Sequence, residues 1–123
     1  MPMYHSEQRQ IEKARRHNAD PLVTLHPDTA AGLELTDDDW VRVVTPQGSI
    51  RARARLTDIL DPRMVDVQHG WWFPERKMAE SELYGVFESN ANILCPDAPE
   101  FCSPEIGGWP HTALLCRIEK DGH

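Results

Sequence analysis

Two asparagines separated by one residue, Asn90 and Asn92 in the stretch ESNANIL, are the side chains whose type and spacing most suggest ligand binding. In extended backbone, residues two apart point to the same side, so both amides would face one surface. Each amide offers donor and acceptor groups, which match the edge of a purine or a pterin ring. Asparagine is also common in loops, so an ordinary loop is the alternative explanation.

A second stretch, QHGWWFPERK at 68–77, places His69 and Gly70 before two adjacent tryptophans, Trp71 and Trp72. Successive side chains of a strand point to opposite faces, and the nearby Gly and Pro indicate a turn. One tryptophan can therefore turn inward beneath the loop, while the other must lie on a surface. The sequence leaves open which of the two is buried.

The first ten residues gather five hydrogen-bonding side chains ahead of the first expected strand. A solvated arm is the ordinary explanation for them, and a ligand-binding arm is the alternative. The apolar side chains of 1–20 are too sparse for a buried helix face, so we expect an arm with about one to three helical turns that ends at Pro21. The five side chains are His5, Ser6, Glu7, Arg9 and Gln10.

Other groups that could do chemistry have simpler explanations. The Asp triplet at 37–39 could bind a metal, but its place between an expected helix and strand predicts a turn, because Asp tolerates left-handed backbone. Cys95, Cys102 and His111 match none of the paired spacings of structural zinc sites. Cys116 falls on the apolar side of an expected strand and is predicted to lie in the core. No complete catalytic motif is present.

Composition limits the classes of function. A chain of 123 residues is most simply one domain. The net charge of −7 argues against nucleic-acid binding, which depends on Lys and Arg. No apolar run is long enough for a transmembrane helix, so we expect no direct membrane insertion. Three cysteines without close pairing fit a reducing compartment or buried free thiols better than a disulfide framework. The compartment, cytoplasmic or periplasmic, depends on the parent protein and stays open.

The elements that must position these residues are short. Alternation at 49–57 places four apolar residues on one side and Arg51, Arg53 and Arg55 on the other. This arginine face could hold phosphate, although a solvated outer strand face is the usual explanation. The turn before it, at 45–48, is expected to give Gly48 a positive φ.

The whole pattern predicts a mainly β domain, a small β-barrel with short helices and a long C-terminal loop region. The long loop, at 69–112, carries five of the ten prolines and little periodicity. The expected short helix is 26–33, and the expected strands are 22–25, 40–44, 49–57, 64–67 and 113–119.

Taken in order, these stretches resemble the C-terminal molybdopterin-dinucleotide-binding domain of the dimethyl sulfoxide reductase superfamily. That superfamily includes formate dehydrogenases, nitrate reductases, and thiosulfate and polysulfide reductases. The similarity covers 4–120, nearly the whole chain. It rests on YHSEQRQI at 4–11, the run from HPDTAAG to HGWW at 26–72, NANIL at 90–94, and LCRIEK at 115–120.

The resemblance implies a double-psi β-barrel at 21–123, preceded by the arm at 1–20. It also implies that one face of the barrel closes over two molybdopterin guanine dinucleotides, which bind molybdenum or tungsten. The residues of this chain that the resemblance places at the cofactor are His5, Ser6, Glu7, Arg9, His69, Gly70, Trp71, Trp72, Asn90 and Asn92.

The resemblance further implies that catalysis depends on other domains of the enzyme. The iron–sulfur cysteine motif and the residue that binds the metal belong to other domains of such enzymes. We therefore expect this chain to bind cofactor without catalysis of its own, and to supply no metal ligand. The expected partners are the remaining domains of a parent catalytic subunit, with iron–sulfur and membrane-anchor subunits as further candidates.

Two positions depart from the family pattern. Glu34 and Asp38 stand where many relatives have Gly. Both positions are expected to require positive φ, which costs a non-Gly residue about 1 kcal/mol.

Two alternatives remain open. The domain could be a separately encoded subunit of a multi-subunit molybdenum or tungsten dehydrogenase, as in formylmethanofuran dehydrogenases. It could instead be a double-psi barrel for protein interaction, as at the N-termini of some AAA ATPases. An interaction module of that kind has no need for Asn90, Asn92 or the HGWW loop.

Overall fold

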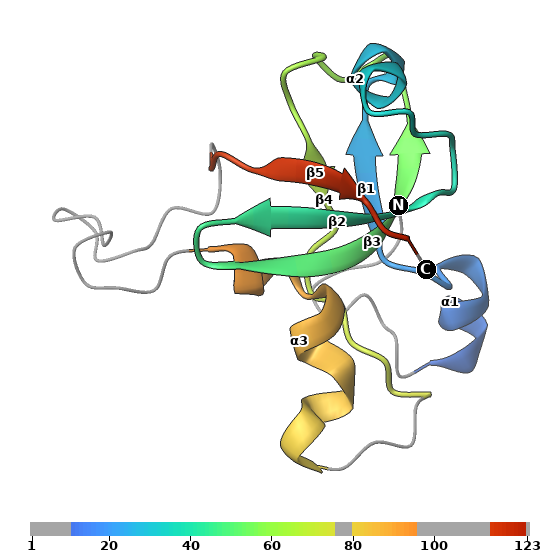
Figure 1. Ribbon diagram of the computed structural model, residues 1–123. Coiled ribbons are helices and arrows are strands. Elements are labelled where there is room, and N and C mark those ends of the chain that lie inside the picture. The colour runs from blue at the N-terminus through green and yellow to red at the C-terminus, as the bar shows by residue number, and fades with distance from the viewer. Residues whose placement is uncertain (1–10, 76–79, 96–113, 123) are drawn as a thin grey trace, which may run out of the picture.

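In the computed structural model, which describes residues 11–75, 80–95 and 114–122, the chain forms one five-stranded sheet with short helices around it (Figure 1). The strand order is β4-β1-β3-β2-β5. This confirms a mainly β domain. The strands are β1 Leu22–Leu25, β2 Trp40–Thr45, β3 Gly48–Leu56, β4 Asp66–Val67 and β5 Arg117–Lys120.

The central strand β3 holds two parts of the sheet together. Its first six residues pair antiparallel with β2, and its last four pair parallel with β1. Only Arg53 belongs to both ladders, opposite Trp40 on one side and Leu22 on the other. Figure 1 shows the consequence: β3 runs beside β2 and then turns upward beside β1. The sheet is therefore strongly coiled around its apolar face.

The coiled sheet encloses the hydrophobic core. The alternation predicted for 49–57 is confirmed, because Ile50, Ala52 and Ala54 are buried while Leu56 packs against the core's edge. β1 and β2 contribute their own alternate residues to the same cluster. The remaining buried members are Val23, Leu25, Ala30, Leu35, Val41, Val43, Leu94 and Ile118.

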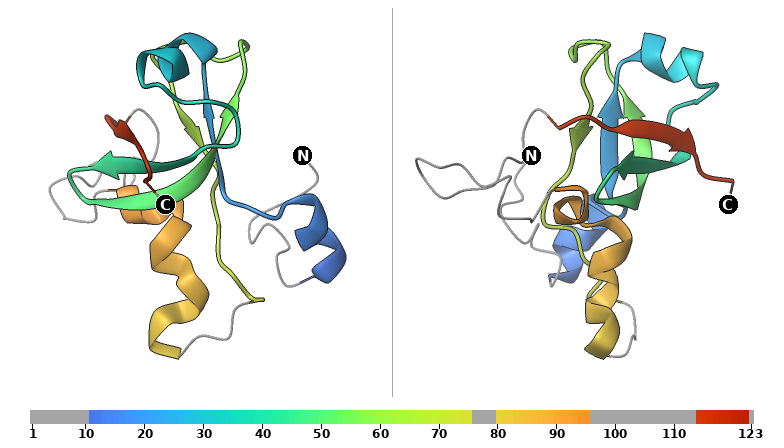
Figure 2. Two further views of the ribbon diagram at one scale, coloured as in Figure 1. Left: turned by 45° about the vertical axis from the view of Figure 1, so that its right-hand side comes forward. Right: turned by 60° about the vertical axis from the view of Figure 1, so that its left-hand side comes forward.

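In the described ranges, five short helices surround the sheet. α2 lies at one end and α3 projects from the other, as all views in Figures 1 and 2 show. The helix of the arm, α1, ends at His17 and buries no side chain. The expected short helix before Pro21 is therefore confirmed. No helix in the described part of the chain is long and apolar enough to cross a membrane. The helices are α1 Glu12–His17, α2 Pro27–Gly32, η1 Glu80–Gly85, α3 Val86–Ser89 and η2 Ala91–Leu94.

Three expectations about local structure are wrong. The stretch expected to be loop contains helical turns at 80–94, which are too short to show a helical period. Gly48 does not take positive φ, because a two-residue turn at 46–47 brings it directly into β3. Cys116 is exposed instead of buried.

The predicted strands at 64–67 and 113–119 begin later than expected. Met64 donates its N–H to the Asp61 carbonyl at 2.9 Å, so it closes a turn and β4 starts only at Asp66. β5 starts at Arg117, which pairs with Val44, because β2 ends one residue later at the hairpin turn.

The Asp triplet forms the predicted turn. Asp37 Oδ1 accepts a hydrogen bond from Leu56 N at 2.9 Å, and Asp39 Oδ2 accepts one from Thr36 N at 3.0 Å. Asp38 has φ 69°, and its N–H donates to the Ala54 carbonyl at 2.8 Å. These carboxylates therefore fix the backbone between α2 and β2.

Replacement of Glu34 by Gly tests the left-handed position after α2. Glu34 has φ 57°, which confirms the expected positive φ. Relief of that conformation gains about 1–2 kcal/mol, while the added freedom of the unfolded chain removes about 0.4–1 kcal/mol. We expect Glu34→Gly to raise the melting temperature by a few degrees. Glu34→Ala keeps the Cβ and should give no such gain; equal melting temperatures would contradict the prediction.

Asp39 should make stability depend on pH. The Thr36 backbone N–H bonded to its carboxylate holds the pKa of Asp39 below the ordinary value of 3.8, assisted by Lys120. A pKa lowered in the folded state stabilises the fold above the unfolded pKa, and that contribution disappears as pH falls through the lowered folded pKa. Urea denaturation should show Asp39→Asn less stable than wild type at pH 7, with the gap closing below pH 3.8. A gap of constant size would contradict this.

Candidate functional site

The HGWW loop, residues 69–72, follows β4, and hydrogen bonds hold the backbone where it begins. Gln68 extends the pairing with β1, since its N–H donates to the Leu22 carbonyl at 3.1 Å and its Oε1 accepts from Leu22 N at 3.2 Å. Gly70 follows with φ 69°, a conformation that favours glycine. The chain therefore turns sharply just before the two tryptophans.

This turn separates the two tryptophans. Trp71 is fully buried and meets Phe73 edge to face, with ring centroids 5.9 Å apart. Trp72 is only partly buried and meets Tyr84 of η1 edge to face at 6.2 Å. The expectation that one tryptophan turns inward is confirmed, and Trp71 is the buried one.

Asn90 joins this loop to the amide pair. Its Nδ2 donates to the Trp71 carbonyl at 3.0 Å, and its Oδ1 accepts from Asn92 N at 3.0 Å, where it caps η2. Both ends of the amide thus hold backbone groups, which leaves one N–H and one lone pair for any other contact. Asn90 therefore links the HGWW loop to η2 through these two hydrogen bonds.

A cavity of about 380 Å³ lies where the sheet does not close. Residues 64–67 along β4 form one wall, and Leu114 and Cys116, ahead of β5, form another. η2 contributes Asn92, and the HGWW loop contributes His69. The other lining residues are Val43, Thr45, Ala91, Leu94 and Cys95.

The structure thus brings together part of the predicted set. His69 and Asn92 are exposed and line one cavity, while Asn90, Gly70 and Trp71 fix the backbone behind them. Trp72 is not among the lining residues. Four further predicted residues, His5, Ser6, Glu7 and Arg9, lie outside the described residues.

Sequence reasoning missed two polar residues of the cavity, Thr45 and Asp66. Thr45 is buried at the end of β2, and its Oγ1 donates to the Leu94 carbonyl at 2.8 Å, which holds η2 against the sheet. A Thr before Pro in a turn carried no functional signal. Asp66 was visible as a charge within an apolar strand, a pattern that marks one exposed face.

On the arginine face of β3, Arg55 is exposed, as a solvated face requires, whereas Arg51 and Arg53 are ion-paired and not arranged for phosphate. Arg51 makes ion pairs with Asp121 and, at 3.7 Å, with Glu88 of α3. Arg53 pairs with Asp20 at 3.1 Å. Both guanidinium groups stack on the Trp40 ring, at 4.5 and 5.5 Å from its centroid. Three carboxylates therefore balance two arginines, so the cluster connects segments instead of attracting an anion.

The thiols at the cavity show no sign of a metal site. Desolvation raises the pKa of the Cys95 and Cys116 thiols above the ordinary value. Within the ranges that the structure describes, no three His, Cys, Asp or Glu side chains come together to hold a metal. Cys102 and His111 lie outside those ranges.

Comparison with known proteins gives the family. The model of the molydopterin dinucleotide binding domain matches residues 3–105. The chain therefore belongs to this family. It is a molybdopterin-dinucleotide-binding domain of the dimethyl sulfoxide reductase superfamily.

Individual relatives agree with this family. Dopamine dehydroxylase of Eggerthella lenta is 38% identical over 80 residues, which cover 64% of this chain and 8% of that protein. Trimethylamine-N-oxide reductase of Haemophilus influenzae is 30% identical over 98 residues, which cover 80% and 12%. The solved acetylene hydratase of Pelobacter acetylenicus superposes with a TM-score of 0.86 at 25% identity, over 96% of this chain and 16% of that one. The chain thus spans a small fraction of the relatives that it matches.

Gly48→Ala tests how η2 is held at the cavity. A Cβ on Gly48 would lie 3.0 Å from both Cγ2 and the carbonyl oxygen of Ile93, next to Asn92. η2 would have to move by a few tenths of an ångström, and we expect a loss of about 1–3 kcal/mol in the free energy of unfolding. Gly32→Ala is the matched control, because nothing lies within 4 Å of its Cβ. Equal stability of the two variants in urea would contradict the prediction.

Proposed function

We propose that the cavity between β4 and the segment before β5 holds one ring system of the molybdopterin dinucleotide, contacted by Asn92 and His69. The observation that carries this proposal is that these two side chains line one cavity, and that Asn90 joins the two segments that carry them through the Trp71 carbonyl and the Asn92 backbone N–H. Asn90 then acts mainly by positioning Asn92 and the HGWW loop. Direct contact of Asn90 with the cofactor stays a prediction.

The size and chemistry of the cavity support this assignment. A volume near 380 Å³ lies at the lower end of the usual range for small-molecule sites, about 300–1,000 Å³. It suits a pterin or guanine ring better than the whole dinucleotide. The walls are mainly apolar, while Asn92, His69 and Asp66 supply an amide, an imidazole and a carboxylate. Such groups can pair with the alternating donors and acceptors of a pterin edge, each costing about 1–3 kcal/mol if buried unpaired.

We further infer a double-psi β-barrel as the detailed fold. The parallel pairing of β1 with β3 inside an otherwise antiparallel sheet supports it, as does the bend of β3 at Arg53. The arm at 1–20 would complete the cofactor face through His5, Ser6, Glu7 and Arg9, while the barrel at 21–123 supplies the rest.

The chain would serve as the cofactor-binding part of a larger molybdenum or tungsten oxidoreductase. When bound, the cofactor carries the metal that supplies the redox chemistry, whereas the residues of this chain orient the ring system and shield it from water. The short span of this chain relative to its relatives supports that role. Iron–sulfur and membrane-anchor subunits remain candidates as further partners.

Substitution of the two asparagines in the complete enzyme tests the site. Asn92→Ala removes a contact, so we expect about two- to tenfold lower cofactor retention, the effect of one hydrogen bond, with little change in melting temperature. Asn90→Ala should reduce retention and also lower the melting temperature, because it frees the Trp71 carbonyl and uncaps η2. Metal content and released guanine nucleotide are the measurements.

Gln47→Ala is the matched control for loss of an amide. Gln47 is an exposed residue of the β2–β3 turn that does not itself line the cavity, and its one bond to a lining residue, from its backbone N–H to Thr45 Oγ1, is kept in the variant, so both properties should stay unchanged. Normal metal and guanine content in both asparagine variants would contradict the proposed site.

A further inference from the structure

Thr45 is a polar residue at an apolar position of β2. Val41 and Val43 of that strand are fully buried, and Thr45 takes the next position on the same side, where it is only 8% exposed. A valine there would continue the apolar series with nearly the same shape. A buried hydroxyl costs free energy unless it is hydrogen bonded. The reason for a threonine at this position should therefore lie in the bonds that its hydroxyl makes.

The hydroxyl of Thr45 both donates and accepts a hydrogen bond. Oγ1 donates to the Leu94 carbonyl at 2.8 Å and accepts from the Gln47 backbone N–H at 3.3 Å. A hydroxyl has one proton to donate, and this one goes to the end of η2. Thr45 therefore joins the β2–β3 turn to a segment that lies 49 positions away in the sequence.

η2 is a single helical turn that depends on support from outside. Within it, Ile93 N–H donates to the Asn90 carbonyl at 3.1 Å, and Cys95 N–H donates to the Asn92 carbonyl at 3.2 Å. One turn of this kind is too short to be stable by itself. The Asn90 side chain holds its beginning, through the Asn92 N–H, and the bond from Thr45 holds its end.

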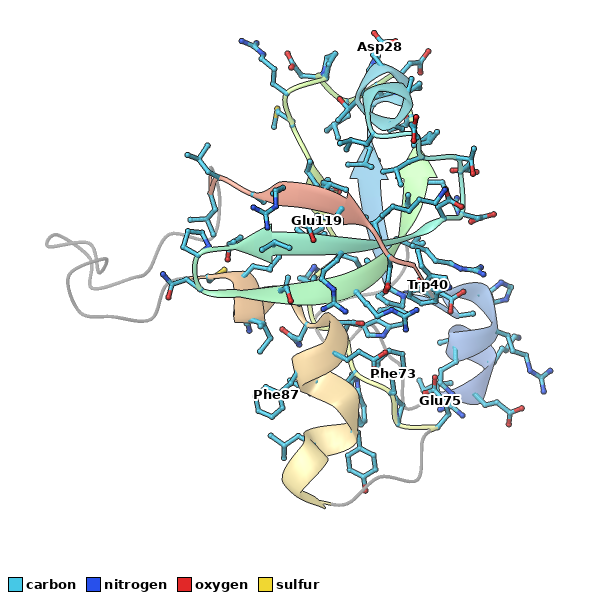
Figure 3. All side chains as sticks on the ribbon, viewed as in Figure 1. Asp28, Trp40, Phe73, Glu75, Phe87 and Glu119 are labelled. Atoms are coloured by element: carbon cyan, nitrogen blue, oxygen red, sulfur yellow. The ribbon has the colours of Figure 1, made fainter. Side chains whose placement is uncertain are left out.

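Gly48 completes the support of η2 by the hairpin. It pairs with Thr45 across the hairpin, and a Cβ at Gly48 would lie 3.0 Å from the carbonyl oxygen of Ile93. Figure 3 shows the helical segment that carries Phe87 leading up to η2, which lies beside the closed end of the β2–β3 hairpin. The hairpin end therefore fixes the turn that carries the exposed side chain of Asn92.

We propose that Thr45 is a positioning residue of the cofactor site. Its hydroxyl holds η2 through the Leu94 carbonyl, so that Asn92 meets the ring system in the cavity. This role requires no contact between Thr45 and the ring, because the hydroxyl proton is already given to Leu94. The inference rests on the proposed function, which assigns the contact to Asn92. It adds a residue, distant in sequence, on which that contact depends.

Removal of the hydroxyl at nearly constant shape tests the proposal. Thr45→Val is made in the complete enzyme, alone and together with Asn92→Ala, and the rates at which metal and guanine nucleotide are lost during dialysis are measured. Thr45→Ser restores a hydroxyl at the same position. Thr24→Val is the matched control, because Thr24 is a half-buried residue of β1 that does not line the cavity.

We expect Thr45→Val to lose the cofactor about two- to tenfold faster than the unsubstituted enzyme, which is the effect of one hydrogen bond. In the Asn92→Ala background the same substitution should change the rate by less than about twofold, because the contact that Thr45 positions is already gone. Thr45→Ser should bring the rate back toward that of the unsubstituted enzyme, and Thr24→Val should leave it unchanged.

A merely structural role of Thr45 would give a different pattern. The proposal is overturned if Thr45→Val loses the cofactor at the normal rate, or accelerates the loss by the same factor in both backgrounds. It is also overturned if Thr45→Ser or Thr24→Val loses the cofactor as fast as Thr45→Val.

Gly48→Ala keeps the test decisive if Thr45→Val yields no folded enzyme. It displaces η2 from the same hairpin, so its effect on cofactor loss should likewise disappear in the Asn92→Ala background. An equal effect of Gly48→Ala in both backgrounds would overturn the proposal.

Asn92→Ala by itself separates this inference from the proposed function. Faster cofactor loss in Asn92→Ala, together with an undiminished further effect of Thr45→Val, would overturn only the role of Thr45. A normal rate of loss in Asn92→Ala would overturn the proposed contact itself, and with it the role of Thr45.

Discussion

The pairing of β3 with two neighbours, one antiparallel and one parallel, is the constraint on which the rest of the structure depends. Because only Arg53 lies in both ladders, β3 must bend there, and the sheet coils around its apolar face. The coil places β4 at one edge and β5 at the other. The cavity lies beside these two edges. The site is thus a consequence of how the sheet bends.

Backbone hydrogen bonds from side chains assemble the cavity wall. Thr45 Oγ1 donates to the Leu94 carbonyl, and Asn90 Nδ2 donates to the Trp71 carbonyl. Asn90 Oδ1 accepts from the Asn92 N–H. Gly48 allows η2 to approach the hairpin closely. These contacts position two exposed groups, His69 and Asn92, whose own side chains remain directed to the cavity. Rigid support behind exposed polar groups is what ligand recognition requires.

The outer face of β3 connects segments that are far apart in sequence. Arg51 joins α3 to the end of β5, and Arg53 joins the sheet to the residue before Pro21. Surface ion pairs individually contribute about 0–1 kcal/mol, so their value lies in alignment more than in stability. Through Arg51 the same face ties α3 to the sheet.

The sequence by itself determined the features that depend on near neighbours: the strands at 22–25 and 40–44, the alternation in 49–57 and the Asp turn. Period and turn chemistry encode these locally. Tertiary structure alone decided that Trp71, and not Trp72, is buried. It also decided that the Asn90 side chain bonds the Trp71 carbonyl, and that Arg53 pairs with a carboxylate far along the chain. It also decided that Gly48 is needed for a close approach and not for its φ. Each of these depends on a partner far along the chain, which no local pattern can specify.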